Sequence, residues 1–174
     1  IDKLRSRLKY QSWQIDINIP ELTAAILEQL DSLFIHRKFI STTDIDNTII
    51  QISRSFHPDP NYQKLTLRIQ ISQIHKHTYK KFSSFINQCY EHKIVNKDIW
   101  DFTHLHKQVL DSTIVHGKDF NLDFYHFTDV LQHRLLQINN QIIERPQFYY
   151  LRCAYKPNIT IQECLERYQQ LSTY

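Results

Sequence analysis

The stretch of sequence that decides the fold runs from Lys64 to His92 and reads KLTLRIQISQIHKHTYKKFSSFINQCYEH. Its first part alternates polar residues with the apolar residues Leu65, Leu67, Ile69 and Ile71. This period of two predicts a half-buried β-strand over residues 64–72. From Gln73 the apolar period changes to 3.6, which predicts an amphipathic helix as far as about Val95. The alternative is that residues 64–72 are simply the first turns of that helix.

A second strand is predicted near the start of the chain. Over residues 12–19 the apolar residues Trp13, Ile15, Ile17 and Ile19 again alternate strictly with polar ones. Pro20 ends this pattern, because proline provides no backbone donor for a sheet and is favoured in the first turn of a helix. We expect this strand to pair with the strand at residues 64–72.

The rest of the chain carries helical patterns. Ser41 followed by Asp44, and Thr160 followed by Glu163, have the spacing of helix N-caps, and Asn96 can cap a third helix. Two prolines between His57 and Asn61 predict a loop. The predicted helices cover residues 21–39, 41–56, 73–95, 96–116, 121–144, 146–155 and 160–171. The sequence thus predicts a mostly α, α-rich α+β fold: a multi-helix bundle with two short strands in its N-terminal half. We expect a single domain over 1–174, mixed α/β in 1–72 and all-helical in 73–174.

Composition excludes several classes of protein. The chain has one glycine among 174 residues, whereas the Gly-rich phosphate loops of nucleotide-binding folds need several. No run of 18 apolar residues is present, so we expect no membrane-spanning segment. The three cysteines lack metal-binding spacing, and we interpret them as reduced thiols of a cytoplasmic protein. A nuclear protein, or an effector inside a host cell, is an alternative.

One stretch of the chain has the composition of a binding site for an anionic partner. Between Pro60 and Tyr90 there is no acidic residue, although the net charge of the whole chain is only +3. On a helix over residues 73–92, the basic side chains fall on one arc and the apolar ones on the other. The predicted nucleic-acid or anion-binding residues are Lys64, Arg68, Lys76, His77, Lys80 and Lys81. The alternative is an ordinary solvated face whose counter-charges come from the aspartates of residues 98–129.

Neither the ten histidines nor the aromatic residues define a site. His75 falls on the apolar arc and is interpreted as a buried core histidine, so we expect no metal and no cofactor. Whether His104, His106, His116 and His126 converge on a metal is left open. Arginines interleaved with aromatics in residues 130–162 fit either a core helix or a stacking surface for single-stranded nucleic acid.

These observations predict a non-enzymatic intracellular binding protein. Its basic surface would contact nucleic acid, as a regulatory or replication accessory module. The alternative is a protein–protein interaction module, such as a scaffold, inhibitor or effector, that docks onto an acidic or apolar partner surface. An enzyme is the less favoured class, because no catalytic constellation is evident. The oligomeric state is not predicted.

Overall fold

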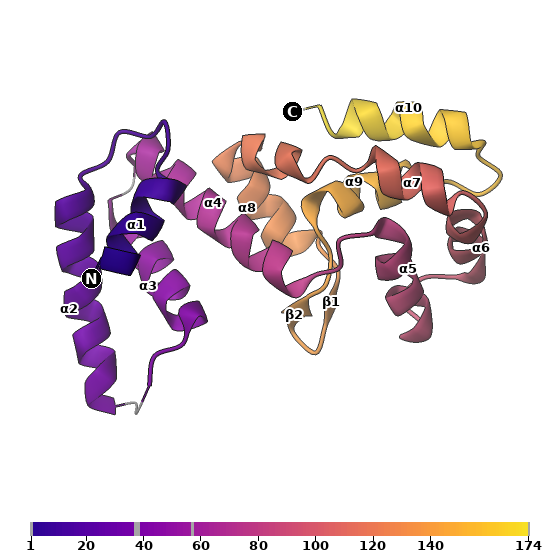
Figure 1. Ribbon diagram of the computed structural model, residues 1–174. Helices are drawn as coiled ribbons and strands as arrows, with labels where there is room; N and C mark the ends of the chain where they lie inside the picture. The colour runs from indigo at the N-terminus through magenta and orange to yellow at the C-terminus, as the bar shows by residue number, and fades with distance from the viewer. Residues whose placement is uncertain (1, 37–38, 57, 174) are drawn as a thin grey trace. The chain divides into compact units, whose positions relative to one another are not determined.

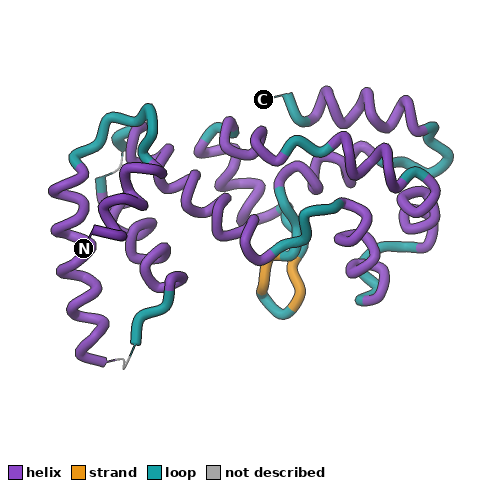
Figure 2. Tube along the Cα trace, in the orientation of Figure 1, coloured by secondary structure: helices purple, strands orange, loops and turns teal. Residues whose placement is uncertain are grey.

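The computed structural model describes residues 2–36, 39–56 and 58–173, with the side chain of His36 excepted. These residues form ten α-helices, one 3-10 helix and one two-stranded hairpin, shown in Figures 1 and 2. The mostly α prediction is therefore confirmed. The chain divides into two compact units, residues 1–73 and 74–174. The prediction of a single domain stays a prediction. No helix of the described residues is long and apolar enough to cross a membrane.

The first unit is a small helical core. Its helices are α1 (Asp2–Gln11), α2 (Ile19–His36), α3 (Thr42–Ser55) and the larger part of α4 (Pro60–His77). Buried aliphatic side chains from all four helices form one cluster, which includes Leu8, Leu22, Ile26, Ile49, Leu65 and Ile69. Arg7 forms an ion pair with the buried Asp46 and so joins α1 to α3. The predicted loop before α4 is present at residues 58–59, while His57 lies outside the described residues.

Both predicted strands are wrong. Residues 64–72 lie within helix α4, where Leu65, Leu67, Ile69 and Ile71 are all at most 2% exposed. On a helix, residues two apart point about 200° away from each other. The alternation therefore reflects a helix buried on opposite sides, which single-sequence periodicity does not distinguish from a strand.

Residues 12–14 form a turn, residues 15–18 connect it to α2 without regular secondary structure, and Ile19 begins α2. The side chain of Trp13 is 66% exposed, so it does not share a buried face with the isoleucines that follow. Arg68 of α4 donates hydrogen bonds from Nη1 to the carbonyl oxygens of Gln11 and Trp13, at 2.8 and 2.7 Å. The backbone of this turn is thus held by a side chain and not by a partner strand.

The second unit contains the remaining elements. They are the end of α4, α5 (Phe82–Glu91), α6 (Lys97–Leu105), α7 (Lys107–Thr113), the 3-10 helix η1 (His116–Asn121), α8 (Phe124–His133), β1 (Gln137–Ile138), β2 (Gln141–Ile142), α9 (Pro146–Ala154) and α10 (Ile161–Leu171). The core of this unit is aromatic: Phe82, Phe85 and Phe148 lie in mutual ring contact and are at most 2% exposed. Phe148, Tyr150 and Leu151 of α9 are buried, which favours the core helix over the stacking surface for this part of residues 130–162.

The two observed strands lie in the C-terminal half of the chain, inside the stretch predicted as a helix over residues 121–144. Helix α8 ends at His133, and β1 pairs antiparallel with β2. Asn139 and Asn140 connect them with φ angles of 50° and 62°. Asparagine adopts this left-handed region at low cost, and two such residues in succession form a tight hairpin turn. This local turn signal overrides the apolar spacing on which the prediction relied.

The three predicted N-caps are confirmed. The hydroxyls of Ser41 and Thr160 accept hydrogen bonds from the backbone of Asp44 and Glu163, each in a complete capping box. Asn96 caps α6 by accepting a hydrogen bond from the backbone of Ile99. The helix predicted to follow Asn96 is shorter than expected, because it breaks at His106 into α6 and α7.

Candidate functional site

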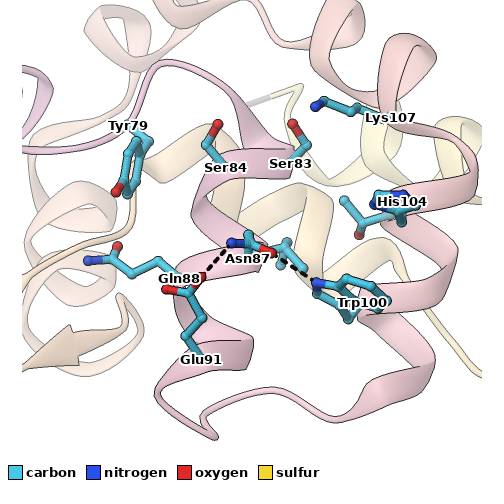
Figure 3. Close-up of a pocket in the computed structure, with 11 residues that line it drawn as sticks. Tyr79, Ser83, Ser84, Asn87, Gln88, Glu91, Trp100, His104 and Lys107 are labelled. Atoms are coloured by element: carbon cyan, nitrogen blue, oxygen red, sulfur yellow. Dashed lines mark hydrogen bonds between the residues drawn. The ribbon is translucent and has the colours of Figure 1, made fainter.

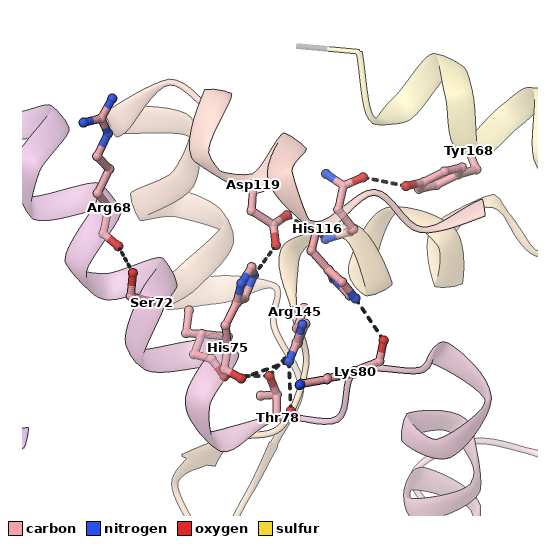
Figure 4. Close-up of polar contacts among 11 residues, drawn as sticks. Arg68, Ser72, His75, Thr78, Lys80, His116, Asp119, Arg145 and Tyr168 are labelled. Carbon is pink, nitrogen blue, oxygen red and sulfur yellow. Dashed lines mark hydrogen bonds and ion pairs between the residues drawn. The ribbon is translucent and has the colours of Figure 1, made fainter. Parts of the chain in front are cut away.

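A buried arginine lies at the end of helix α4 and terminates it. Arg145 precedes α9 and is only 3% exposed. Its guanidinium donates hydrogen bonds to the carbonyl oxygens of His75 and Thr78, at 2.9 and 3.0 Å, and to the hydroxyl of Thr78 at 2.9 Å (Figure 4). The last carbonyls of a helix have no partner within the helix, and a basic side chain can satisfy them. Helix α4 therefore ends at His77, and the single helix predicted over residues 73–95 does not form.

The residues beyond this break begin a new helix with help from another distant side chain. Lys81 is the N-cap residue of α5, and its side chain makes no capping hydrogen bond. Asp111 of α7 accepts hydrogen bonds from the backbone N–H and the hydroxyl of Ser83, both at 2.8 Å. A carboxylate at this position satisfies a free N–H of the first turn and favours the positive end of the helix dipole.

Next to Arg145 lies a group of two imidazoles and one carboxylate. Asp119 of η1 is fully buried and lies 2.6 Å from Nε2 of His75. The other oxygen of Asp119 accepts a hydrogen bond from the backbone of Gln147 at 3.1 Å. His116 completes the group, and one ligand atom from each of these three side chains lies within 4.8 Å of the others. Figure 4 shows that the three side chains come from α4 and η1.

His116 is held in one defined state. Its Nε2 lies 2.9 Å from the carbonyl oxygen of Lys80, which can only accept, so Nε2 carries the hydrogen. Burial lowers the pKa of His116, and the nearby Arg145 acts in the same direction. The imidazole is therefore neutral at neutral pH, with an unprotonated Nδ1. That nitrogen is buried and has no hydrogen-bond partner among the described residues.

A second buried ion pair fixes the hairpin to α9. Glu144 is fully buried, and its carboxylate accepts hydrogen bonds from Nε and Nη2 of Arg152, at 2.7 and 3.0 Å. It also accepts one from the backbone of Leu136 at 2.9 Å. Burial raises the pKa of Glu144 and by itself would lower that of Arg152, but the hydrogen bonds to Glu144 raise the pKa of Arg152 overall. The guanidinium also packs over the ring of Tyr149.

An open pocket lies between helices α5 and α6, with a volume of about 380 Å³ (Figure 3). Trp100 and His104 line the pocket with stacked rings, and Tyr90, which is not a lining residue, also stacks on Trp100. Trp100 donates its indole N–H to Asn87 at 3.1 Å. The other lining groups are mainly polar, including Ser84, Gln88 and Lys107. These groups can hydrogen-bond a small polar molecule. Ser83 also lines the pocket, and its hydroxyl donates to Asp111 at 2.8 Å.

The single helix over residues 73–92, on which the sequence predicted a basic arc, does not form. Lys64 and Arg68 belong to the first unit, and Lys76, His77, Lys80 and Lys81 belong to the second. Lys80 and Lys81 lie in the connection between α4 and α5, off any helix. The guanidinium of Arg68 is hydrogen-bonded to backbone carbonyls, while Lys64, Lys76, His77, Lys80 and Lys81 are exposed. Anion binding by these residues stays a prediction.

Sequence reasoning did not single out the residues that organise this region. Asp119, Arg145 and Glu144 are separated in sequence from the groups they contact, in one case by 70 residues. One signal is present in the sequence: the aspartates of residues 98–129 are possible partners for the basic stretch. Asp111 and Asp119 do contact that stretch, at Ser83 and His75. Of the histidines left open as a metal group, His116 contacts His75, whereas His126 contacts Tyr150.

Comparison with known proteins gives similarity to one class of enzyme subunit. The chain is 26% identical over 163 residues to the ribonucleoside-diphosphate reductase large subunit of Caenorhabditis elegans, covering 88% of this chain and 20% of that protein. The subunit of the same name from Plasmodium falciparum is 32% identical over 145 residues, 76% of this chain and 18% of that protein. The one from Monkeypox virus is 26% identical over 165 residues, with coverage of 88% and 21%. The chain thus spans about a fifth of the length of these relatives. No family model matches the chain.

This similarity overturns the functional prediction from sequence. The relatives are subunits of enzymes, so the predicted non-enzymatic binding protein is wrong, both as a regulatory nucleic-acid-binding module and as a scaffold, inhibitor or effector. The prediction took the absence of acidic residues between Pro60 and Tyr90 as a sign of an anionic partner. A lack of acidic residues in one stretch gives no information on the carboxylates that the fold brings to it, as Asp119 illustrates.

Proposed function

We propose that this chain is a helical part of the large subunit of a ribonucleoside-diphosphate reductase, and that the whole protein reduces ribonucleoside diphosphates together with a smaller subunit. The observation that supports the proposal is the similarity to such subunits over 88% of the chain, in proteins from a nematode and a poxvirus. An intracellular location belongs to the same proposal and is in keeping with the three free cysteines.

Within that protein we assign a structural and not a redox role to the described residues. Reduction needs a group that gives electrons, and thiols are the redox-active side chains of this chain. Burial raises the pKa of Cys89 to about 12 and that of Cys164 to about 11. The pKa of Cys153 is also raised by burial. A reactive cysteine needs a lowered pKa and access to its reagent. We therefore place the reducing groups of the whole protein outside these residues.

Thiol labelling tests this assignment. In the native chain at pH 8, we expect Cys89 and Cys164 to react with iodoacetamide more than about 100-fold slower than a free thiol, because the thiolate is scarce and buried. In denaturant all three cysteines should react at the same rate. Mass spectrometry of peptides after timed quenching measures each site. Rapid native labelling of Cys89 or Cys164 would contradict the assignment.

The activity is tested on the whole protein that contains these residues, purified with its smaller subunit. We expect conversion of a ribonucleoside diphosphate to the corresponding deoxyribonucleoside diphosphate when a dithiol supplies the two electrons, with the lost hydroxyl leaving as water. Chromatography of the nucleotides follows the reaction. The control is the same mixture without the smaller subunit, which should be inactive. If the complete mixture converts no ribonucleoside diphosphate, the proposal fails.

A further inference from the structure

We propose that His75, His116 and Asp119 bind a divalent transition-metal ion of the Zn²⁺ type. This inference concerns only residues of this chain and does not depend on the reductase assignment. One ligand atom from each of the three residues already lies within 4.8 Å of the others. Two imidazoles and one carboxylate are a ligand set that Zn²⁺ and similar ions accept, with a fourth position left for water.

The state of His116 is the strongest support. Its Nε2–H donates to the carbonyl oxygen of Lys80, which leaves the lone pair of Nδ1 free, and Nδ1 is buried without a hydrogen-bond partner in the described part of the chain. Histidines that bind metals commonly donate their other ring N–H to a backbone carbonyl, which fixes the tautomer and the ring orientation.

Asp119 is arranged in the same way. Its Oδ1 accepts a hydrogen bond from the backbone of Gln147 at 3.1 Å, while Oδ2 points to His75. A carboxylate that binds a metal is usually oriented by such a hydrogen bond. The aromatic rings of Phe120 and Phe148 lie edge-on to the two imidazoles, at centroid distances of 5.6 and 5.8 Å. The group therefore has oriented ligands, with an aromatic ring beside each imidazole.

Metal binding requires one local rearrangement. Nε2 of His75 and Oδ2 of Asp119 are 2.6 Å apart, whereas two ligands of a tetrahedral zinc ion are about 3.3 Å apart. The two groups must separate by less than about 1 Å. The hydrogen now shared between them must also leave Nε2, either to Nδ1 of a neutral His75 or, from an imidazolium, to solvent. Affinity should consequently fall as the pH is lowered.

The charge of Arg145 limits the affinity of the three-residue group for a metal ion. This positive charge acts on both His116 and Asp119. It favours the neutral form of His116, but it also repels a dication. Because its guanidinium is committed to the carbonyl oxygens of His75 and Thr78, it stays beside the site. We therefore expect a dissociation constant in the micromolar range, which is a much weaker affinity than that of structural zinc sites.

The test is titration of the purified chain with Zn²⁺ by calorimetry and with Co²⁺ by visible absorption. We expect one ion per chain, Co²⁺ bands of a tetrahedral site without a thiolate charge-transfer band, and weaker binding at pH 5.5 than at pH 7.5. The informative variant is His116→Gln, because glutamine keeps a donor for the Lys80 carbonyl and lacks the Nδ1 ligand. It should weaken binding by at least about tenfold.

His133→Ala is the matched control, because His133 is exposed at the end of α8 and is not one of the three grouped residues. It should leave the affinity unchanged, and circular dichroism should show both variants folded. The proposal is overturned if the unmodified chain binds neither ion at millimolar concentration. It is equally overturned if His116→Gln binds as tightly as the unmodified chain, which would place the ion elsewhere.

Discussion

Replacing Glu144 by alanine is expected to lower the free energy of unfolding of the second unit by about 3–5 kcal/mol. The substitution leaves the guanidinium of Arg152, whose side chain is 22% exposed, without its carboxylate. It also leaves the backbone N–H of Leu136 without an acceptor. Removing one member of a buried pair costs far more than the pair itself contributes, because the remaining charge stays desolvated.

Fluorescence in a urea titration measures this effect in the relevant unit. The chain has two tryptophans, Trp13 and Trp100, one in each unit. A Trp13→Phe background, in which the exposed indole of the first unit is absent, makes the signal specific for Trp100. Two further variants complete a cycle: Arg152→Met, and the double variant Glu144→Ala with Arg152→Met. The double variant should be more stable than the sum of the two single effects predicts.

An exposed ion pair in the same unit provides the control. Lys97 and Asp101 lie 2.6 Å apart on α6, with side chains that are 66% and 50% exposed. Asp101→Ala should cost no more than about 0.5 kcal/mol, since water screens such pairs. If Glu144→Ala costs no more than Asp101→Ala, the carboxylate of Glu144 does not stabilise the second unit more than an exposed one does.

Replacing Asp119 by alanine is expected to cost a similar amount, about 3–5 kcal/mol. Asp119 is fully buried, and its carboxylate connects η1 to α4 through His75 and to α9 through the backbone of Gln147. Without it, the buried cation Arg145 loses the negative charge that faces it. The backbone N–H of Gln147 also loses its acceptor, at a cost that a buried N–H cannot recover from water.

Asp119→Asn separates the contribution of the negative charge from that of the hydrogen bond to Gln147. Its amide oxygen can still accept from Gln147, so the loss should be smaller, about 1–3 kcal/mol. Amide hydrogen exchange at Gln147 should accelerate strongly in Asp119→Ala and little in Asp119→Asn. Asp129→Asn serves as the control, because Asp129 is exposed in its contact with Arg134 and should change stability by at most about 0.5 kcal/mol. Equal exchange at Gln147 in both Asp119 variants would contradict this account.

The site depends on contacts that have no local signature. Arg145 determines where α4 ends, although it lies 70 residues from the carbonyl of His75 that it binds. Asp111 supports the start of α5 across 28 residues. A helix wheel drawn over residues 73–92 therefore placed Lys76, Lys80 and Lys81 on one face that the chain does not form. The same limit applies to residues 64–72, whose alternation is that of a helix buried on opposite sides.

The sequence by itself determined the mostly helical class, the helix starts at Ser41, Asn96 and Thr160, and the short helix that begins at Pro146. These features rest on interactions within three or four residues, so the local order of side chains is sufficient to define them. Only the tertiary structure decided the break after His77 and the grouping of His75, His116 and Asp119. Buried polar groups must find partners, and the fold alone brings together partners that lie far apart in the sequence.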